Sequence, residues 1–183
     1  MKLRPIVLAL ALAVSAAPAL AAPAPAASLA ARLQRVEDLQ KIDALLERYY
    51  WIIDAHDYRT YSEMFVADGE LICCSSQFKG RQAIFDMMSK SSPNFGPGSV
   101  HTGSDHEVDP KGDTANVRSR WAMIVKRANG EPGILERGRY EDVVVRDKDG
   151  QWRFKSRHVF AEMRTTAPAA AGAPTPAPAA PAR

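Results

Sequence analysis

The fold of this chain is decided by the stretch from Leu45 to Asp57, which reads Leu-Leu-Glu-Arg-Tyr-Tyr-Trp-Ile-Ile-Asp-Ala-His-Asp. The pattern predicts the end of the main helix, with the acid Asp54 on the apolar side. A carboxylate beside so much apolar surface is costly to ionise unless it is paired, exposed at the helix end or tuned for chemistry. Because the downstream pattern predicts a curved sheet, we expect this sheet to wrap the helix and close a pocket over Asp54.

Upstream of this stretch, apolar residues recur every three or four positions and predict one long amphipathic helix. The helix is expected to begin after an N-cap at Ser28 and could be broken near Val36. Asp57 is well placed to cap a second, short helix over 58–66, and residues 80–89 predict a third.

The remaining elements are predicted to be strands. A first strand covers 70–76, and after a loop at 91–98 the pattern changes to period two. Four further strands follow over 99–108, 113–127, 133–146 and 151–163, the last two joined by the hairpin signal Asp149-Gly150. Helices followed by a four-strand antiparallel meander and one earlier strand predict an α+β domain, with the helices packed on one face of a curved sheet.

Both ends of the chain predict segments outside this domain. A basic start, an apolar run over 6–17 and a small-x-small cleavage site at 19–21 predict a cleavable signal peptide over 1–21, and hence a secreted or periplasmic protein. The apolar run is too short for a permanent membrane span, although a retained N-terminal anchor is the alternative. An Ala/Pro linker at 22–27 and an Ala/Pro-rich tail at 166–183, which we expect to be disordered, leave 28–165 as a single folded domain.

Charge and cysteine content narrow the function classes. Without Lys2 and Arg4 the chain has 22 basic and 21 acidic residues, a near-balance that argues against nucleic acid as a partner. Cys73 and Cys74 are adjacent, so a disulfide between them would be strained on a strand, and we favour two buried small side chains. No Cys-x-x-Cys or His-x-x-x-His pattern occurs, so no metal site is predicted.

Ordered motifs extend over residues 36–160. They are Ile42-x-x-Leu45-x-x-x-Tyr49, Asp54-Ala-His-Asp57-Tyr58, Met64-Phe65-x-x-Asp68-Gly-Glu-Leu, Gly80-Arg-x-x-Ile84, His101 with Asp105, Gly112-Asp-Thr-Ala-x-Val117-x-Ser119, Gly138-Arg-Tyr-Glu-Asp142 and Asp149-Gly-x-Trp152-Arg-Phe. Together they resemble the SnoaL-like branch of the nuclear-transport-factor-2-like superfamily. The resemblance implies a cone-shaped α+β barrel with a deep apolar pocket, and many relatives are dimers through the outer sheet face. The superfamily includes dehydratases, isomerases, cyclases, epoxide hydrolases and non-catalytic subunits, so it does not by itself define a reaction.

The resemblance to scytalone-dehydratase-like enzymes implies that Asp54 and His101 are the catalytic acid and base. An acid and an imidazole that face one cavity can carry out a cofactor-free elimination or isomerisation. The chain also departs from that pattern, because the second pocket histidine of those enzymes would fall near Gly138 and their pocket tyrosine is replaced by Ile53.

Two further polar residues could supply the missing groups. If Trp152 and Phe154 face the core, period two places His158 on the same inward face, and Asp105 is the other candidate. The remaining candidate binding residues are Tyr50, Tyr140 and Trp121.

Each candidate also has a purely structural explanation. Asp54 could be a helix-end acid that pairs with a backbone N–H or with Arg157, and His101 and the aromatic residues could be core or rim groups.

Three function classes follow. The first is a cofactor-free lyase or isomerase, dehydratase-like, that acts on a small hydrophobic carbonyl or polyketide-like compound. The second is a non-catalytic protein of the same fold that binds a similar small molecule. A scaffold whose outer sheet face binds a protein partner is a third, less favoured class. We further expect a homodimer, no nucleic acid, no cofactor and no stable membrane anchor after signal cleavage.

Overall fold

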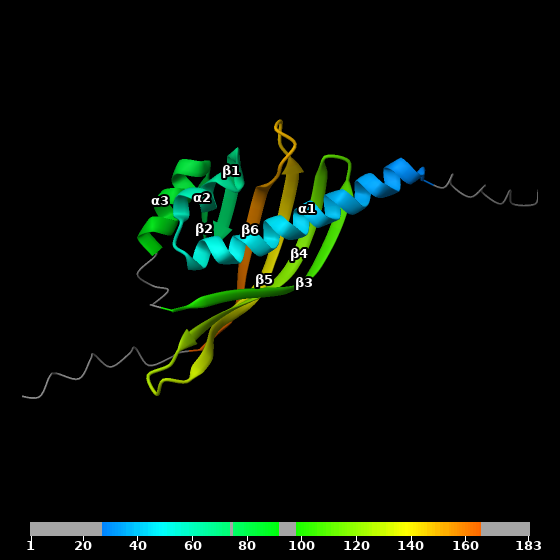
Figure 1. Ribbon diagram of the computed structural model, residues 1–183. Coiled ribbons are helices and arrows are strands. Elements are labelled where there is room, and N and C mark those ends of the chain that lie inside the picture. Colours follow the sequence, from blue (N-terminus) through cyan, green and yellow to red (C-terminus); the bar gives the residue numbers. More distant parts are fainter. Residues whose placement is uncertain (1–26, 74, 92–97, 166–183) are drawn as a thin grey trace, which may run out of the picture.

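The computed structural model describes residues 27–73, 75–91 and 98–165 (Figure 1). The elements in chain order are α1 (Leu29–Asp54), α2 (Tyr58–Glu63), β1 (Phe65–Cys73), β2 (Ser76–Lys79), α3 (Arg81–Ser91), β3 (Val100–Lys111), β4 (Thr114–Lys126), β5 (Pro132–Arg146) and β6 (Trp152–Arg164). The predicted signal peptide, most of the linker, the tail and Cys74 lie outside the described residues.

The strands form one six-stranded mixed sheet in the order β2-β1-β6-β5-β4-β3. β1 and β6 run parallel, and the other neighbours run antiparallel. Figure 1 shows this sheet curving around α1, which lies across its face. The predicted α+β class and the meander are therefore confirmed. The sheet is open rather than a closed barrel, and β2 was not predicted as a strand.

Local capping explains where the first two helices begin. The Ser28 hydroxyl accepts a hydrogen bond from the Ala31 backbone N–H, and the Asp57 carboxylate accepts one from that of Thr60. Both predicted N-caps are thus confirmed. α1 is continuous through Val36, and its first turns expose Leu29 and Leu33 where the helix projects beyond the sheet (Figure 1). None of the helices in the described ranges has the length and apolar character needed to cross a bilayer.

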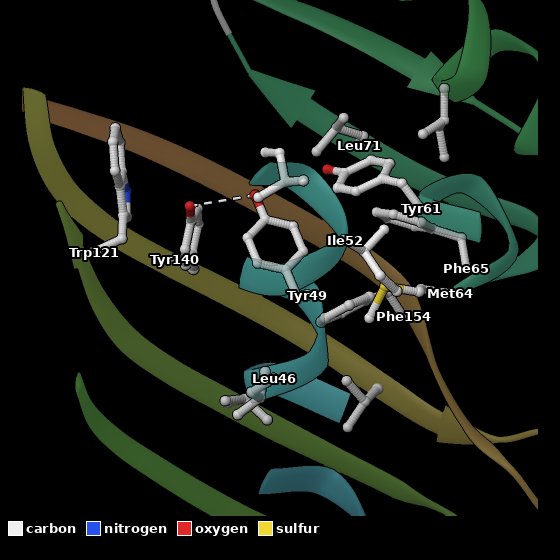
Figure 2. Close-up of a cluster of buried hydrophobic side chains, with 14 of the residues drawn as sticks. Leu46, Tyr49, Ile52, Tyr61, Met64, Phe65, Leu71, Trp121, Tyr140 and Phe154 are labelled. Carbon is white, nitrogen blue, oxygen red and sulfur yellow. Dashed lines mark hydrogen bonds between the residues drawn. The ribbon is translucent and has the colours of Figure 1, made fainter. Parts of the chain in front are cut away.

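The core lies between α1 and the concave face of the sheet. Ile42, Leu46, Tyr49 and Ile53 of α1 are buried there. In Figure 2 the Tyr49 ring lies among aromatic side chains from α2, β5 and β6. Burial of side chains of this size stabilises a fold by about 1.5–3 kcal/mol each, so this packing sets the position of α1 on the sheet.

A fully buried ion pair lies within this apolar core. Arg157 of β6 donates from Nε and Nη2 to the two carboxylate oxygens of Asp142 on β5, at 2.9 and 2.7 Å, and both side chains are 0% exposed. Burial opposes the charge on Arg157, but the adjacent carboxylate raises the pKa of Arg157 above its ordinary value, so the guanidinium is charged. Burial raises the pKa of Asp142, against the effect of the two hydrogen bonds from Arg157. Arg157 therefore pairs with Asp142 and not with Asp54, which removes one structural explanation for Asp54.

A second ion pair joins α1 to Arg146, the last residue of β5. Its contribution to stability should depend on pH. Buried Asp38 accepts hydrogen bonds from Arg146 at 2.7 Å and from Gln34 at 3.0 Å. Burial alone would raise the pKa of Asp38, but these two donors outweigh it and hold the pKa below its usual value. A depressed carboxyl pKa adds stability above the unfolded value near 4, and this stability is lost as the pH falls through the folded value.

We expect Asp38→Asn to lower the free energy of unfolding by about 1–3 kcal/mol at pH 7, because the charged acceptor is lost. The difference from the wild type should shrink as the pH falls below about 4, where the carboxyl of the unfolded chain takes up its proton, and should disappear below the lowered pKa of the folded state. Urea unfolding at pH 7 and pH 3 measures both values. Asp43→Asn, which removes a half-exposed α1 carboxylate near His106, is the control with a small effect. An equal loss of unfolding free energy in Asp38→Asn at both pH values would contradict a stabilising role for the ionised Asp38 carboxylate.

Candidate functional site

The structure brings the two predicted catalytic residues into direct contact. Asp54 is the last residue of α1, and His101 is near the start of β3. The His101 backbone N–H lies 3.0 Å from both carboxylate oxygens of Asp54, and ring Nδ1 lies 2.7 Å from Oδ1. A carboxylate can only accept, so Nδ1 carries the proton of the neutral imidazole. Asp54 thereby fixes the orientation of the ring.

Close packing of α1 on β3 makes this contact possible. The Tyr50 side chain occupies the space beside Gly103, where an added Cβ would lie 1.7 Å from the Tyr50 hydroxyl oxygen. Burial raises the pKa of Tyr50 to about 12. Among the described residues, Tyr50 does not line the cavity that His101 faces, so the structure places this candidate at the helix–sheet contact.

His101 lines a cavity of about 660 Å³, which is in the usual range for small-molecule sites. Tyr49, Tyr61, Leu71 and the two α3 methionines form apolar and aromatic parts of its wall. Cys73 also lines the cavity and is half-buried, so it is less enclosed than we predicted. The cavity can therefore hold a mainly apolar molecule against an imidazole whose orientation is fixed.

Two of the predicted binding residues, Trp121 and Tyr140, also line this cavity. Their rings are stacked, with centroids 5.6 Å apart and planes 16° from parallel, and the Trp121 indole N–H donates to the Arg139 carbonyl oxygen at 3.3 Å. The Tyr140 hydroxyl lies 3.3 Å from that of Tyr49. Burial raises the pKa of Tyr140 well above its usual value, so this phenol is protonated at neutral pH.

Asp105 and His158 are not among the described residues that line the cavity, and each lies on a strand that contains a register shift. Asp105 lies where the β3–β4 pairing shifts, its side chain is 64% exposed, and it pairs with Arg120 at 3.5 Å. In β6 the shift falls between Phe154 and Ser156 and reverses the alternation of faces. Arg157 consequently points inward. His158 lies opposite the exposed residue Glu141 in the β5–β6 register, and its ring packs on Phe160 with centroids 3.8 Å apart.

Close packing explains why residue 138 is a glycine. An added Cβ would lie 1.8 Å from the Phe160 backbone oxygen and 3.1 Å from the Trp121 indole nitrogen. The neighbouring strand and the indole already fill this space.

Sequence reasoning treated Tyr49 as a core residue, whereas the structure places it on the cavity wall as well. A tyrosine on the apolar face of a helix, where an aliphatic residue would pack equally well, was the available signal. Among the described residues, no three His, Cys, Asp or Glu side chains gather closely enough to hold a metal ion.

The cavity between α1 and the open, curved sheet has His101 on its wall, whereas Asp54 holds that histidine but is not among the described residues that line the cavity. The molecule is thus a pocket-containing α+β protein. The model of the SnoaL-like domain matches residues 34–158, and the chain belongs to this family. The predicted resemblance to this family is thus confirmed. No curated protein matches the sequence significantly.

Solved structures with the same fold include three that are at least 25% identical to this chain. A nuclear-transport-factor-2-like protein with a cystatin-like fold from Novosphingobium aromaticivorans is 30% identical over 71% of this chain and 85% of its own, with a TM-score of 0.64. A protein from the same organism assigned as a scytalone dehydratase is 28% identical, with coverages of 73% and 90% and a TM-score of 0.63. Rv3472 from Mycobacterium tuberculosis, of unknown function, is 25% identical, with coverages of 72% and 75% and a TM-score of 0.66.

The packing at Gly138 can be tested by adding one methyl group. Gly138→Ala should destabilise the protein by about 1–3 kcal/mol, because the new Cβ meets backbone that cannot move away. Gly133→Ala on the same strand is the matched control, since its Cβ would meet only the flexible end of Arg127. Thermal unfolding of both variants decides the point. Similar midpoints for the two variants would show that Gly138 is not constrained as described.

Proposed function

We propose that this protein is a cofactor-free lyase or isomerase of the dehydratase type. Its substrate would be a small hydrophobic carbonyl or polyketide-like compound bound in the cavity beside Asp54 and His101. One observation carries the proposal: His101 lines the cavity, and its ring Nδ1 lies 2.7 Å from a carboxylate oxygen of Asp54. Membership of the SnoaL-like family and the likeness to a protein assigned as a scytalone dehydratase support it.

The chemistry requires one group to remove a proton and return it. Nε2 of His101 would take a proton from the carbon α to a carbonyl group, and Asp54 would stabilise the resulting imidazolium. In an elimination, the imidazolium then protonates a leaving hydroxyl on the β carbon, so that a C–O bond breaks, a C=C bond forms and water departs. In an isomerisation, the same proton returns to another carbon of the enolate. Such a positioned group contributes about 10²–10⁴-fold to the rate.

The second candidate function is small-molecule binding without turnover. Gly138 favours this alternative, because its surroundings leave no room for a second pocket histidine. The two functions differ in one measurable respect. An enzyme of the proposed type exchanges the α-proton of a bound carbonyl compound with solvent, and a binding protein does not.

The test is deuterium incorporation from heavy water into a panel of enolisable aromatic ketones, followed by proton NMR. The wild type should catalyse exchange for at least one compound that it binds. Asp54→Asn and His101→Ala should lower that rate by about 100-fold or more, because they remove the oriented base.

His56→Ala is the matched control, because His56 is an exposed histidine that stacks on Tyr58. It should retain the wild-type exchange rate. Thermal midpoints near the wild-type value would show that the two site variants are folded, whereas a large loss in both would mark the residues as structural. Tight binding without exchange in the wild type would favour the second candidate.

A further inference from the structure

A row of residues crosses the sheet side of the cavity, beginning at His101. In the register of the sheet, His101 lies opposite Met123, and Met123 lies opposite Glu136. Glu136 in turn lies opposite Arg164. All four residues line the cavity. Neighbouring strands are about 4.8 Å apart, so the backbone at Glu136 lies about 10 Å from that at His101, two strands away. The cavity wall therefore carries an imidazole and a carboxylate, with a methionine between them.

Glu136 is an enclosed carboxylate with one oxygen left over. Its side chain is only 12% exposed, and its Oε2 accepts a hydrogen bond from Arg164 at 3.1 Å. Within the described ranges, Oε1 has no hydrogen-bond partner. The buried carboxylate of Asp142, by contrast, receives a hydrogen bond on each oxygen. Because an enclosed acceptor without a donor is costly, Oε1 of Glu136 favours an occupant of the cavity that brings a donor.

The end of β6 holds Arg164 beside this carboxylate. Thr165, which follows Arg164, donates from its backbone N–H to the Leu135 carbonyl oxygen at 2.8 Å. Its hydroxyl group donates to the Ile134 carbonyl oxygen, also at 2.8 Å. The Arg164 side chain is 68% exposed, and an ion pair with so exposed a partner adds little to stability. The pair does fix the direction of the Glu136 carboxylate, because one of its oxygens is held.

The surroundings of Glu136 define the kind of donor. Its charge is already balanced by Arg164, so an ammonium group on the ligand would bring an unbalanced charge into a cavity with apolar walls. A neutral hydroxyl group brings no charge, and its hydrogen bond to a carboxylate is about twice as strong as one between neutral groups. Met123, Leu71 and Met88 supply apolar surface, and methionine side chains adapt to the outline of a flat ring.

We propose that Glu136 is a specificity-determining residue of the cavity and accepts a hydrogen bond from a hydroxyl group on a flat, otherwise apolar ligand. This hydroxyl group lies at the end of the ligand away from His101. The inference rests on the proposed function in one respect, because that function places the reacting carbon at the His101 end. Binding of the hydroxyl group requires no turnover, so the two proposals can fail separately.

The test compares two probes, 2-acetyl-6-hydroxynaphthalene and 2-acetyl-6-methoxynaphthalene, in which a methyl group replaces the hydroxyl proton. The full-length wild type should bind the hydroxy compound about tenfold or more tightly, the contribution of a hydrogen bond to a charged acceptor. Glu136→Met keeps the length of the side chain but removes both oxygens, so this preference should disappear. Fluorescence titration of each probe measures the affinities.

Ionisation of the bound probe gives a second measurement, which a purely structural role of Glu136 would not affect. A carboxylate that accepts the naphthol proton opposes formation of the naphtholate anion beside it. The pKa of the bound naphthol should therefore be higher in the wild type than in Glu136→Met. Absorbance of the naphtholate as a function of pH gives both values.

Glu162→Met is the matched control, and it should keep the wild-type preference. Glu162 is an exposed β6 carboxylate that pairs with Arg139 at 2.7 Å, and it is not among the described residues on the cavity wall. A preference that depends on Glu136, without any α-proton exchange, would support this inference and contradict the proposed function. The inference fails if the wild type does not prefer the hydroxy compound, or if Glu136→Met retains the preference.

Discussion

The arrangement of the whole core depends on the buried pair between Arg157 and Asp142. Removal of two charges from water costs several kcal/mol for each ion, and only near-ideal geometry offsets this cost. Here the carboxylate receives two guanidinium hydrogen bonds, and rings of Tyr49, Tyr140 and Phe154 lie 4.1–4.2 Å from the guanidinium carbon. One cation thus ties α1, β5 and β6 to a common point. Loss of either partner alone would leave an uncompensated buried charge.

The cavity and the acid–imidazole pair follow from this constraint. Near the end of α1, Tyr49 packs against the cation, and the neighbouring Tyr50 packs closely on Gly103 of β3. The end of the helix then lies where the Asp54 carboxylate meets the His101 backbone and ring. The side of Tyr49 and Tyr140 that faces the cavity carries the hydroxyl pair. The same residues therefore stabilise the fold and shape the site.

Much of this structure could be predicted from residue patterns, and the failures have a common cause. Periodicity and caps at Ser28 and Asp57 gave the helices and the meander, and the family resemblance brought Asp54 and His101 together. Period-two counting failed at His158 because one irregular residue in β6 reverses the alternation of faces, and no residue type marks this bulge. The inward position of Arg157 was not predicted for the same reason. The signal peptide, the Ala/Pro tail and the homodimer stay predictions.

The central claim is that Asp54 orients His101 as the base of the cavity, and the tautomer of this histidine tests it most directly. Nitrogen-15 NMR of the imidazole ring distinguishes a protonated Nδ1 from a protonated Nε2 at a pH where the ring is neutral. The account predicts that Nδ1 carries the proton in the wild type, held by the Asp54 carboxylate. It also predicts that Asp54→Asn weakens this preference. A neutral His101 with its proton on Nε2 in the wild type would contradict the account.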